Sequence, residues 1–219
     1  MPQNDDSRQF VSRGGEKLQS AIENWKLKIG NLVVLDVGSS TGGFVDCLLQ
    51  NGAKKVYAVD TAYGELAWKL RNDPRVVVME RTNILHLETL LPSVIARSDN
   101  DEAISKLEKI ATLPTLARND EVKVDLITID AGWTKLELVL PICKKFLKNG
   151  GLIIALLKPH YEGGQKNLVK GVVPAELVEE IKDRTIKNIE NLGFKVESVI
   201  DSPILGGAGN KEYLLKITI

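Results

Sequence analysis

Residues 35–44 read LDVGSSTGGF, a group of small residues directly after an apolar run. The run LVVLDV at 32–37 is continuously apolar, as expected of a strand covered on both faces of a parallel sheet. A helix is expected from about Gly43 to Asn51. Glycines between a strand and a helix let the backbone approach a ligand closely, and the first turn of the helix offers free N–H donors. The stretch therefore predicts a ligand-binding turn in an α/β sheet.

The spacing of the small residues narrows the choice of ligand. A nicotinamide fingerprint needs Gly-x-Gly-x-x-Gly, and a P-loop needs Gly-Lys-Ser/Thr; neither is present. The chain instead carries Asp36-x-Gly38-x-Ser40-x-Gly42, the acidic-x-Gly-x-Gly-x-Gly pattern of S-adenosylmethionine (SAM) pockets with one glycine replaced by serine. Asp60 ends the next expected strand, where its carboxylate can accept both ribose hydroxyls. SAM is therefore the expected cofactor.

Strand-like and helix-like segments alternate along the chain. Further strands are expected at 55–60, 75–80, 124–130 and 151–158, and helices at 61–70, 86–96, 135–148 and 174–193. Residues 194–219 contain two β-rich runs around the turn LGGAGN. We therefore expect an α/β, Rossmann-like methyltransferase fold: a mostly parallel seven-stranded sheet with a C-terminal antiparallel hairpin. A nicotinamide-binding sheet would normally be parallel throughout.

Composition excludes several classes of protein. The 29 basic residues balance 29 acidic ones, so a nucleic-acid partner would need a local basic patch. Two cysteines are too few for a disulfide framework or a thiolate metal site, which favours a reducing cytoplasm and no metal. The longest apolar run, at 152–157, is too short to cross a membrane. The first ten residues lack the features of a signal peptide.

Three charged residues are expected at one edge of the sheet. Asp130 and Lys158 end the fourth and fifth strands, and Glu212 lies near the start of the last. Because that last strand runs antiparallel, its beginning meets the carboxyl ends of the others. Each residue alone has a structural explanation, as a cap or a member of a surface pair. Together they indicate a reactive site beside the SAM sulfonium.

A resemblance to a known family extends this interpretation. The segments VSRGGEKL, LDVGSSTGGFVDCLLQNGAKKVYAVD, AWKLRNDPRVVVMERTNI, LLKPHYE and GNKEYLL are similar, in order, to the TlyA/hemolysin A family. That family belongs to the FtsJ-type ribosomal RNA 2′-O-methyltransferases. The resemblance implies a catalytic Lys-Asp-Lys-Glu tetrad at Lys17, Asp130, Lys158 and Glu212. Without it, Lys17 would be read as a solvated helix residue.

The resemblance also implies roles within the site. Lys158 would orient the ribose hydroxyl and accept its proton, while Asp130 and Glu212 hold the ammonium groups. Positioning of oxygen, methyl and sulfur in line would supply most of the rate. The implied cofactor contacts are Gly38, Ser40, Gly42, Gly43 and Phe44 at the methionine part, Asp60 at the ribose, Asn83 near adenine, and Asp130.

The expected partner is ribosomal RNA or a ribosomal subunit, with no membrane and an undetermined oligomeric state. Arg8, Arg13, Lys166 and Lys170 are candidate RNA contacts, and Trp133, His160 and Tyr161 are available for base stacking. The chain departs from the family at AGWTKL after Asp130 and at KPHYE, where Lys-Pro-Gln-Phe-Glu is commoner. These segments are expected to face the substrate, so the target nucleotide stays open.

Residues 1–10 are expected to form a flexible polar leader and 11–219 one methyltransferase domain, without the S4-like RNA-binding module that usually begins TlyA proteins. No chemical role is assigned to the polar segment 97–122. Amino-directed adenine methylation lacks its Asn/Asp-Pro-Pro-aromatic run, and both cysteines fall in expected helices, which disfavours cytosine C5 chemistry. A small-molecule O-methyltransferase and a noncatalytic SAM-binding partner protein remain as alternatives.

Overall fold

A computed structural model describes residues 9–87, 123–132 and 134–219. Most of the helix expected at 86–96 and all of segment 97–122 lie outside these ranges, as do Arg8 and Trp133. None of the helices within them is long and apolar enough to cross a membrane.

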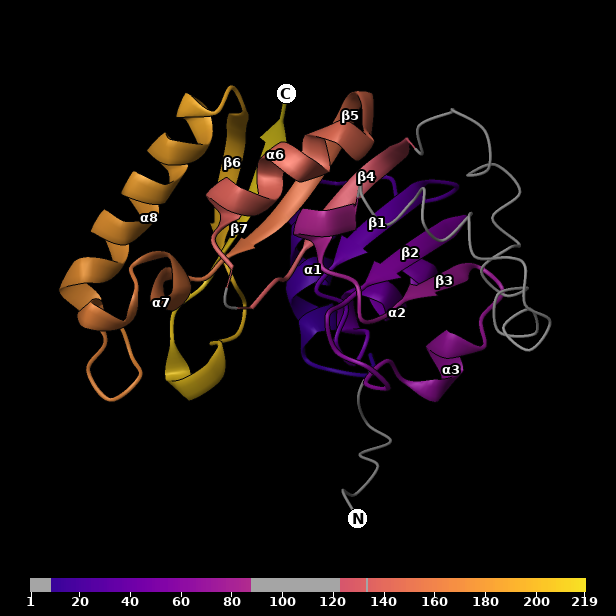
Figure 1. The fold of residues 1–219 in the computed structure, drawn as a ribbon, viewed down its shortest axis with the longest axis horizontal. Coiled ribbons are helices and arrows are strands. Elements are labelled where there is room, and N and C mark those ends of the chain that lie inside the picture. Colours follow the sequence, from indigo (N-terminus) through magenta and orange to yellow (C-terminus); the bar gives the residue numbers. More distant parts are fainter. Residues whose placement is uncertain (1–8, 88–122, 133) are drawn as a thin grey trace, which may run out of the picture.

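A seven-stranded sheet forms the centre of the fold, in the order β3-β2-β1-β4-β5-β7-β6 (Figure 1). β7 pairs antiparallel with both β5 and β6, while the pairs among β1 to β5 are parallel. The prediction of a mostly parallel sheet with a C-terminal antiparallel hairpin is confirmed. The strands are β1 (Val33–Val37), β2 (Lys55–Val59), β3 (Val76–Met79), β4 (Val124–Ile129), β5 (Leu147–Leu157), β6 (Lys195–Asp201) and β7 (Tyr213–Thr218).

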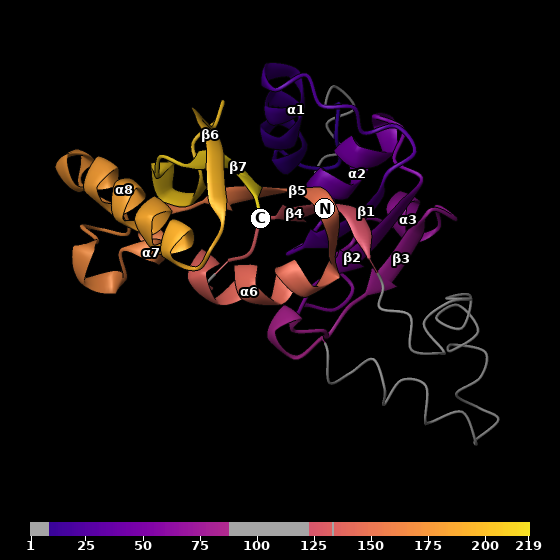
Figure 2. The same ribbon diagram turned by 90° about the horizontal axis from the view of Figure 1, so that it is seen from above.

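Helices cover both faces of the sheet (Figure 2). One apolar cluster lies under α1 (Gly14–Asn24), α2 (Gly43–Gln50) and α3 (Trp68–Arg71). The other lies under α6 (Leu136–Phe146) and α8 (Ala175–Asn191). Val34 and Leu35 are consecutive in β1 and both buried, one in each cluster, because successive strand residues point to opposite faces. This two-sided burial is why the strand reads as a continuous apolar run.

Long helix α8 illustrates how sequence pattern becomes packing. Val178, Ile181, Thr185 and Ile189 are buried along one face, at the three- and four-residue spacing of a helix. Pro174 precedes the first turn, and Gly193 follows the last turn with φ +82°. The short elements that complete the fold are η1 (Ile84–His86), α7 (Pro159–Glu162), η2 (Gln165–Asn167) and η3 (Gly207–Gly209).

Three local expectations need correction. The helix expected at 61–70 is confined to α3, because Asp60 accepts a hydrogen bond from the Ala62 N–H and Gly64 has φ +78°, which hold a turn there. β5 begins at Leu147, four residues before the expected start, beyond a register shift against β4. Phe10, assigned to the leader, is buried and packs against Gly15, where a Cβ would lie 2.3 Å from its ring.

Candidate active site

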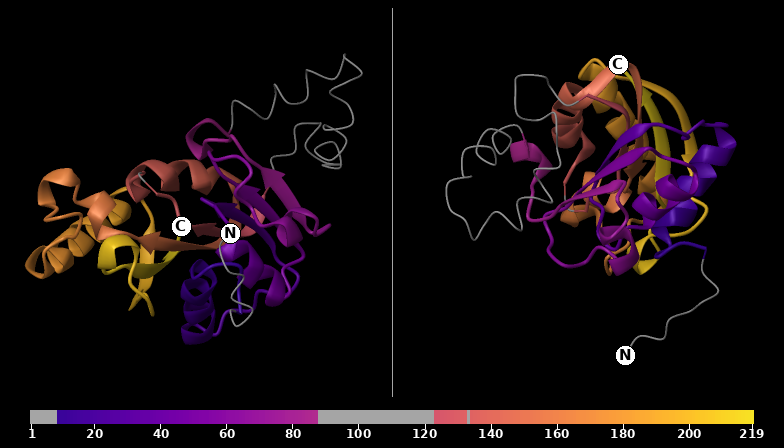
Figure 3. Two further views of the ribbon diagram at one scale, coloured as in Figure 1. Left: turned by 90° about the horizontal axis from the view of Figure 1, so that it is seen from below. Right: turned by 90° about the vertical axis from the view of Figure 1, so that its right-hand side faces the viewer.

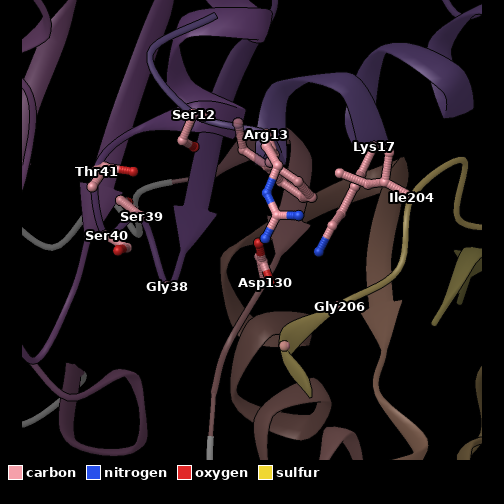
Figure 4. Close-up of a pocket in the computed structure, with 14 residues that line it drawn as sticks. Ser12, Arg13, Lys17, Gly38, Ser39, Ser40, Thr41, Asp130, Ile204 and Gly206 are labelled. Carbon is pink, nitrogen blue, oxygen red and sulfur yellow. The ribbon is translucent and has the colours of Figure 1, made fainter. Parts of the chain in front are cut away.

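A cavity of about 230 Å³ opens at the carboxyl edge of the parallel strands. It lies between the first turns of α1 and α2, the loop after β1, Asp130 at the end of β4, and the loop before β7 (Figure 4). Seen from below in Figure 3, α1 and the loop before β7 lie on the same side of the sheet. Of the predicted site residues, six line this cavity: Lys17, Gly38, Ser40, Gly43, Phe44 and Asp130.

Gly38 brings the β1 loop against the end of β4. Its φ is +84°, and a Cβ there would lie 2.7 Å from the carbonyl oxygen of Asp130. Both the backbone conformation and the close approach require glycine. Ser40, which replaces a glycine of the motif, has φ +43°, so this position also adopts the left-handed conformation. The cofactor motif therefore holds the loop after β1 against the backbone of Asp130, beside the cavity.

The VSRGG segment brings the starts of two helices together. A Cβ on Gly43, the first residue of α2, would lie 2.3 Å from Ser12 Oγ and 2.8 Å from the Gly15 nitrogen. The first turns of α1 and α2 thus touch, and both line the cavity. Each presents the positive end of a helix dipole, which suits a carboxylate or phosphate group, although the Gly15 and Glu16 nitrogens of α1 already donate to the Ser12 and Arg13 oxygens. The glycines of this segment, together with Gly43, are what permit that contact.

The four predicted tetrad residues form two ion pairs. Lys17 Nζ donates to Glu212 Oε2 at 2.6 Å, joining α1 to the residue just before β7. Lys158 Nζ lies 2.6 Å from Asp130 Oδ1, joining the ends of β5 and β4. Figure 4 shows Lys17 reaching down from α1 toward the space between Asp130 and Gly206. Lys17 and Asp130, one residue from each pair, both line the cavity.

The two ion pairs differ in how deeply they are buried. The side chains of Lys17 and Glu212 are 11% and 3% exposed, so Lys17 is not the solvated residue that its helix pattern alone suggests. Gly206 closes over Glu212, since a Cβ there would fall 1.9 Å from Glu212 Oε1. Asp130 is 22% exposed and lines the cavity. The Lys158–Asp130 pair is thus the more accessible of the two.

Three predicted cofactor residues lie outside this cavity of about 230 Å³. Gly42 caps α2 with φ +98° and contacts Leu66 and Leu70 instead. The carboxylate of Asp60 accepts hydrogen bonds from the Ser40 and Ala62 nitrogens, each at 2.7 Å. Asn83 Oδ1 accepts from the Leu85 nitrogen at 3.0 Å and so begins η1. A second small cavity beside Ser39 and Ser40 includes Asp60.

Asp36, the acidic residue that opens the cofactor motif, is completely buried in β1. Thr128 Oγ1 donates to its Oδ1 at 2.6 Å, and its Oδ2 has no hydrogen-bond partner in the described part of the chain. Burial raises the pKa of this carboxyl to about 7, with smaller contributions from the negative charges of Asp130 and Asp60. Asp36 is therefore a titrating group directly beneath the site.

The candidate RNA-contacting residues that the structure describes are Arg13, His160, Tyr161, Lys166 and Lys170. His160 and Tyr161 follow Lys158 in α7, with ring centroids 4.2 Å apart, and Lys158 Nζ lies 5.7 Å from the Tyr161 ring centroid. Burial, together with the nearby positive charges of Lys158 and Lys17, lowers the pKa of His160. Arg13 is exposed and points toward Asp130 in Figure 4. Lys166 and Lys170 are exposed on the segment that follows α7.

The sequence interpretation missed several residues that build the site. Glu162 ends α7 and accepts a hydrogen bond from the Leu136 nitrogen at 2.9 Å, which fixes the start of α6. Burial raises its pKa to about 7. Gly206 and Gly207 line the cavity from the segment interpreted only as a hairpin turn, and Ile204 lines it from the end of the preceding β-rich run. The one available signal was the position of that turn directly before Glu212.

Comparison with known proteins assigns the chain to a family. The family model described as FtsJ-like methyltransferase matches residues 10–218. The putative rRNA methyltransferase YqxC of Bacillus subtilis is 38% identical over 210 residues, which cover 95% of this chain and 65% of that protein. The 16S/23S rRNA (cytidine-2′-O)-methyltransferase TlyA of Mycobacterium tuberculosis is 35% identical over 96% of this chain and 69% of its own length.

A solved structure gives the same result. The structure described as a putative hemolysin from Lactococcus lactis superposes with a TM-score of 0.77 and 36% identity, covering 96% of this chain and 89% of that one. The chain thus spans about two thirds of the length of the Bacillus and Mycobacterium relatives.

Proposed function

Because the chain belongs to the FtsJ-like methyltransferase family, we propose that it transfers the methyl group of SAM to a ribose 2′-hydroxyl of ribosomal RNA. The observation that carries this proposal is the meeting of two lysine–carboxylate pairs, Lys17–Glu212 and Lys158–Asp130, at the edge where the cofactor motif ends. One pair is buried and the other is accessible from the cavity side.

The residues around the cavity suit SAM. Gly38 and Gly43 line the cavity and let the loop after β1 and the start of α2 approach Asp130 and Ser12 closely. The start of α2 offers N–H groups for a carboxylate. Asp60, at the end of β2, offers its carboxylate to the ribose hydroxyls. When bound, SAM supplies an electrophilic methyl group on a positively charged sulfur.

The protein's own residues would then act on the acceptor hydroxyl. Lys158, after releasing its own proton to solvent, would accept the 2′-hydroxyl proton as the oxygen–carbon bond forms and the sulfur–carbon bond breaks. Asp130 holds the ammonium group that results, through the 2.6 Å contact already present. The buried Lys17–Glu212 pair fixes the first turns of α1 against the loop before β7. Most of the rate acceleration comes from holding the three reacting atoms in line.

Ribosomal RNA is the proposed substrate because two relatives that cover most of this chain carry rRNA methyltransferase names, including one that acts on cytidine 2′-hydroxyls. The exposed cations Arg13, Lys166 and Lys170 lie on segments bordering the site, as phosphate contacts would require. The ring of Tyr161, which lies beside Lys158, would stack on the target base.

The test is transfer of labelled methyl from SAM to ribosomal RNA, free and in assembled subunits. Wild type is compared with Lys158→Ala and with Lys148→Ala. Lys148 is a matched control, since its Nζ also lies 2.6 Å from an aspartate of β4, Asp125, at the opposite edge of the sheet. The proposal expects an alkali-resistant 2′-O-methyl nucleotide, lost in Lys158→Ala and retained in Lys148→Ala.

Two outcomes would redirect the assignment. Methylation of a hydroxylated small molecule, with no label in any ribosomal RNA, would favour a small-molecule O-methyltransferase. SAM binding without turnover on either substrate, unchanged in Lys158→Ala, would favour a noncatalytic SAM-binding protein.

A further inference from the structure

Asn210 is a buried polar residue that no step of the proposed reaction uses. It lies two residues before Glu212 and is 3% exposed. Its Oδ1 accepts a hydrogen bond from the Val173 nitrogen at 3.0 Å, and its Nδ2 donates to the carbonyl oxygens of Gly171, at 2.9 Å, and Gly207, at 3.0 Å. The side chain therefore joins two loops that are more than thirty residues apart in sequence.

The first of these loops continues from Lys158 through α7. It turns back at Lys170 and Gly171, whose φ values are +52° and +82°, and a bridge between Val169 and Val172 closes the turn. Lys166 and Lys170 project from it and are exposed. In the described chain, Asn210 supplies side-chain contacts to both sides of this turn, at Gly171 and Val173.

The second loop forms the cavity wall beside Glu212. The backbone oxygen of Asn210 accepts from the Gly206 nitrogen at 2.8 Å, and Gly206 packs directly on the Glu212 carboxylate. Glu212 in turn receives the hydrogen bond from Lys17. Asn210 thus links the loop that carries Lys166 and Lys170 to the wall that holds the buried ion pair.

From these contacts we infer that Asn210 is a positioning residue. It holds the loop after Lys158 and the cavity wall beside Glu212 in a fixed relative position. That arrangement orients the acceptor nucleotide toward Lys158 and Asp130. The inference rests on the proposed function. It depends on an amide, because the site needs one acceptor and two donors in a buried place. A carboxylate there would face the carbonyl oxygens of Gly171 and Gly207 without a proton to donate, so both hydrogen bonds would be lost.

The experiment compares Asn210→Asp and Asn210→Ala with wild type. Asn51→Asp is the matched control, because Asn51 Nδ2 makes similar contacts, to Gln19 Oε1 and the Cys47 oxygen at 2.9 Å, beyond the end of α2. The readouts are kcat and KM for ribosomal RNA, the Kd for SAM by calorimetry, and amide hydrogen exchange at Val173. Thermal unfolding identifies any variant that fails to fold.

We expect both Asn210 variants to lower kcat/KM for RNA at least about tenfold, as the loss of a buried hydrogen bond implies. The Kd for SAM should stay within about twofold of wild type, because Asn210 does not line the cavity. In Asn210→Ala the Val173 amide should exchange faster. In Asn210→Asp the defect relative to wild type should shrink as pH falls, since the protonated carboxyl regains one donor.

Three outcomes would overturn the inference while leaving the proposed function standing. The first is faster exchange at Val173 with unchanged kcat/KM. The second is a parallel loss of SAM affinity. The third is an equal loss of activity in Asn51→Asp. If wild type itself methylates no ribosomal RNA, the proposed function fails and the inference fails with it.

Discussion

Strands β4 and β5 carry a lysine–aspartate pair at each end, and the two pairs have the same length. Lys148 Nζ lies 2.6 Å from Asp125 Oδ1 at one edge, and Lys158 Nζ lies 2.6 Å from Asp130 Oδ1 at the other. Lys148 is 47% exposed, whereas Lys158 is 14% exposed. The second pair adjoins a cavity, a second lysine–carboxylate pair and two helix starts. Surroundings, and not pair geometry, distinguish the candidate active site.

The largest effect should come from Asp36, buried beneath the Lys158 edge. Its carboxyl has a pKa of about 7 in the folded chain against 3.8 for the ordinary value. The folded state therefore holds this proton while the unfolded state releases it, so stability falls as pH rises between those values. At about 1.4 kcal/mol per pKa unit, the total is on the order of 4 kcal/mol. Asp36→Asn should lose that pH dependence.

Urea unfolding of wild type and Asp36→Asn at a series of pH values from about 4 to 8 measures the difference. Other titrating groups cancel because they are common to both proteins. Equal pH dependence in the two proteins would show that Asp36 does not titrate in this range.

The buried Lys17–Glu212 pair should contribute more to the free energy of unfolding than the exposed Lys148–Asp125 pair. Lys17→Met leaves Glu212, which is 3% exposed, without its ammonium partner. Breaking a buried pair in this way costs about 3 kcal/mol. The double variant Lys17→Met/Glu212→Gln should recover part of that loss, because no uncompensated charge remains. Denaturant unfolding and a double-mutant cycle measure both values. A double variant no more stable than Lys17→Met contradicts this account.

Substitution of Asp130 and substitution of Asp125 should have different effects on methyl transfer. Asp130→Asn removes the carboxylate beside Lys158, and we expect methyl transfer to fall about a hundredfold, near 2.7 kcal/mol. Asp125→Asn makes the same chemical change at the other end of the same strands. Its methyl transfer should stay within about twofold of wild type. Labelled-methyl kinetics at saturating SAM compare them, and similar losses in both variants would remove the distinction between the two edges.

The smallest effect should come from Lys148→Ala. This exposed pair should contribute less than about 1 kcal/mol, and that contribution should shrink further at high salt. Unfolding free energies at low and high ionic strength test it. A salt-independent loss larger than that of Lys17→Met would reverse the comparison.

Much of the fold could be predicted from the sequence because the signals are local. Strand β1 is apolar on consecutive residues, and α8 has apolar residues at helical spacing between Pro174 and Gly193. The resemblance to the TlyA/hemolysin A family is confirmed by the family model and by the relatives. The helix expected at 61–70 was wrong for most of its length, since its propensity is overridden by the turn at Asp60 and Gly64.

The sequence by itself determined the order of strands and helices, the glycine motif after β1, and which charged residues fall at strand ends. Tertiary structure alone decided that Lys17 is buried against Glu212, that Gly206 closes over that carboxylate, and that Asn210 ties together two distant loops. The physical reason is range. Strand and helix patterns arise from neighbours a few residues apart, whereas burial and ion pairing depend on segments up to 195 positions apart, which only the packed sheet brings together.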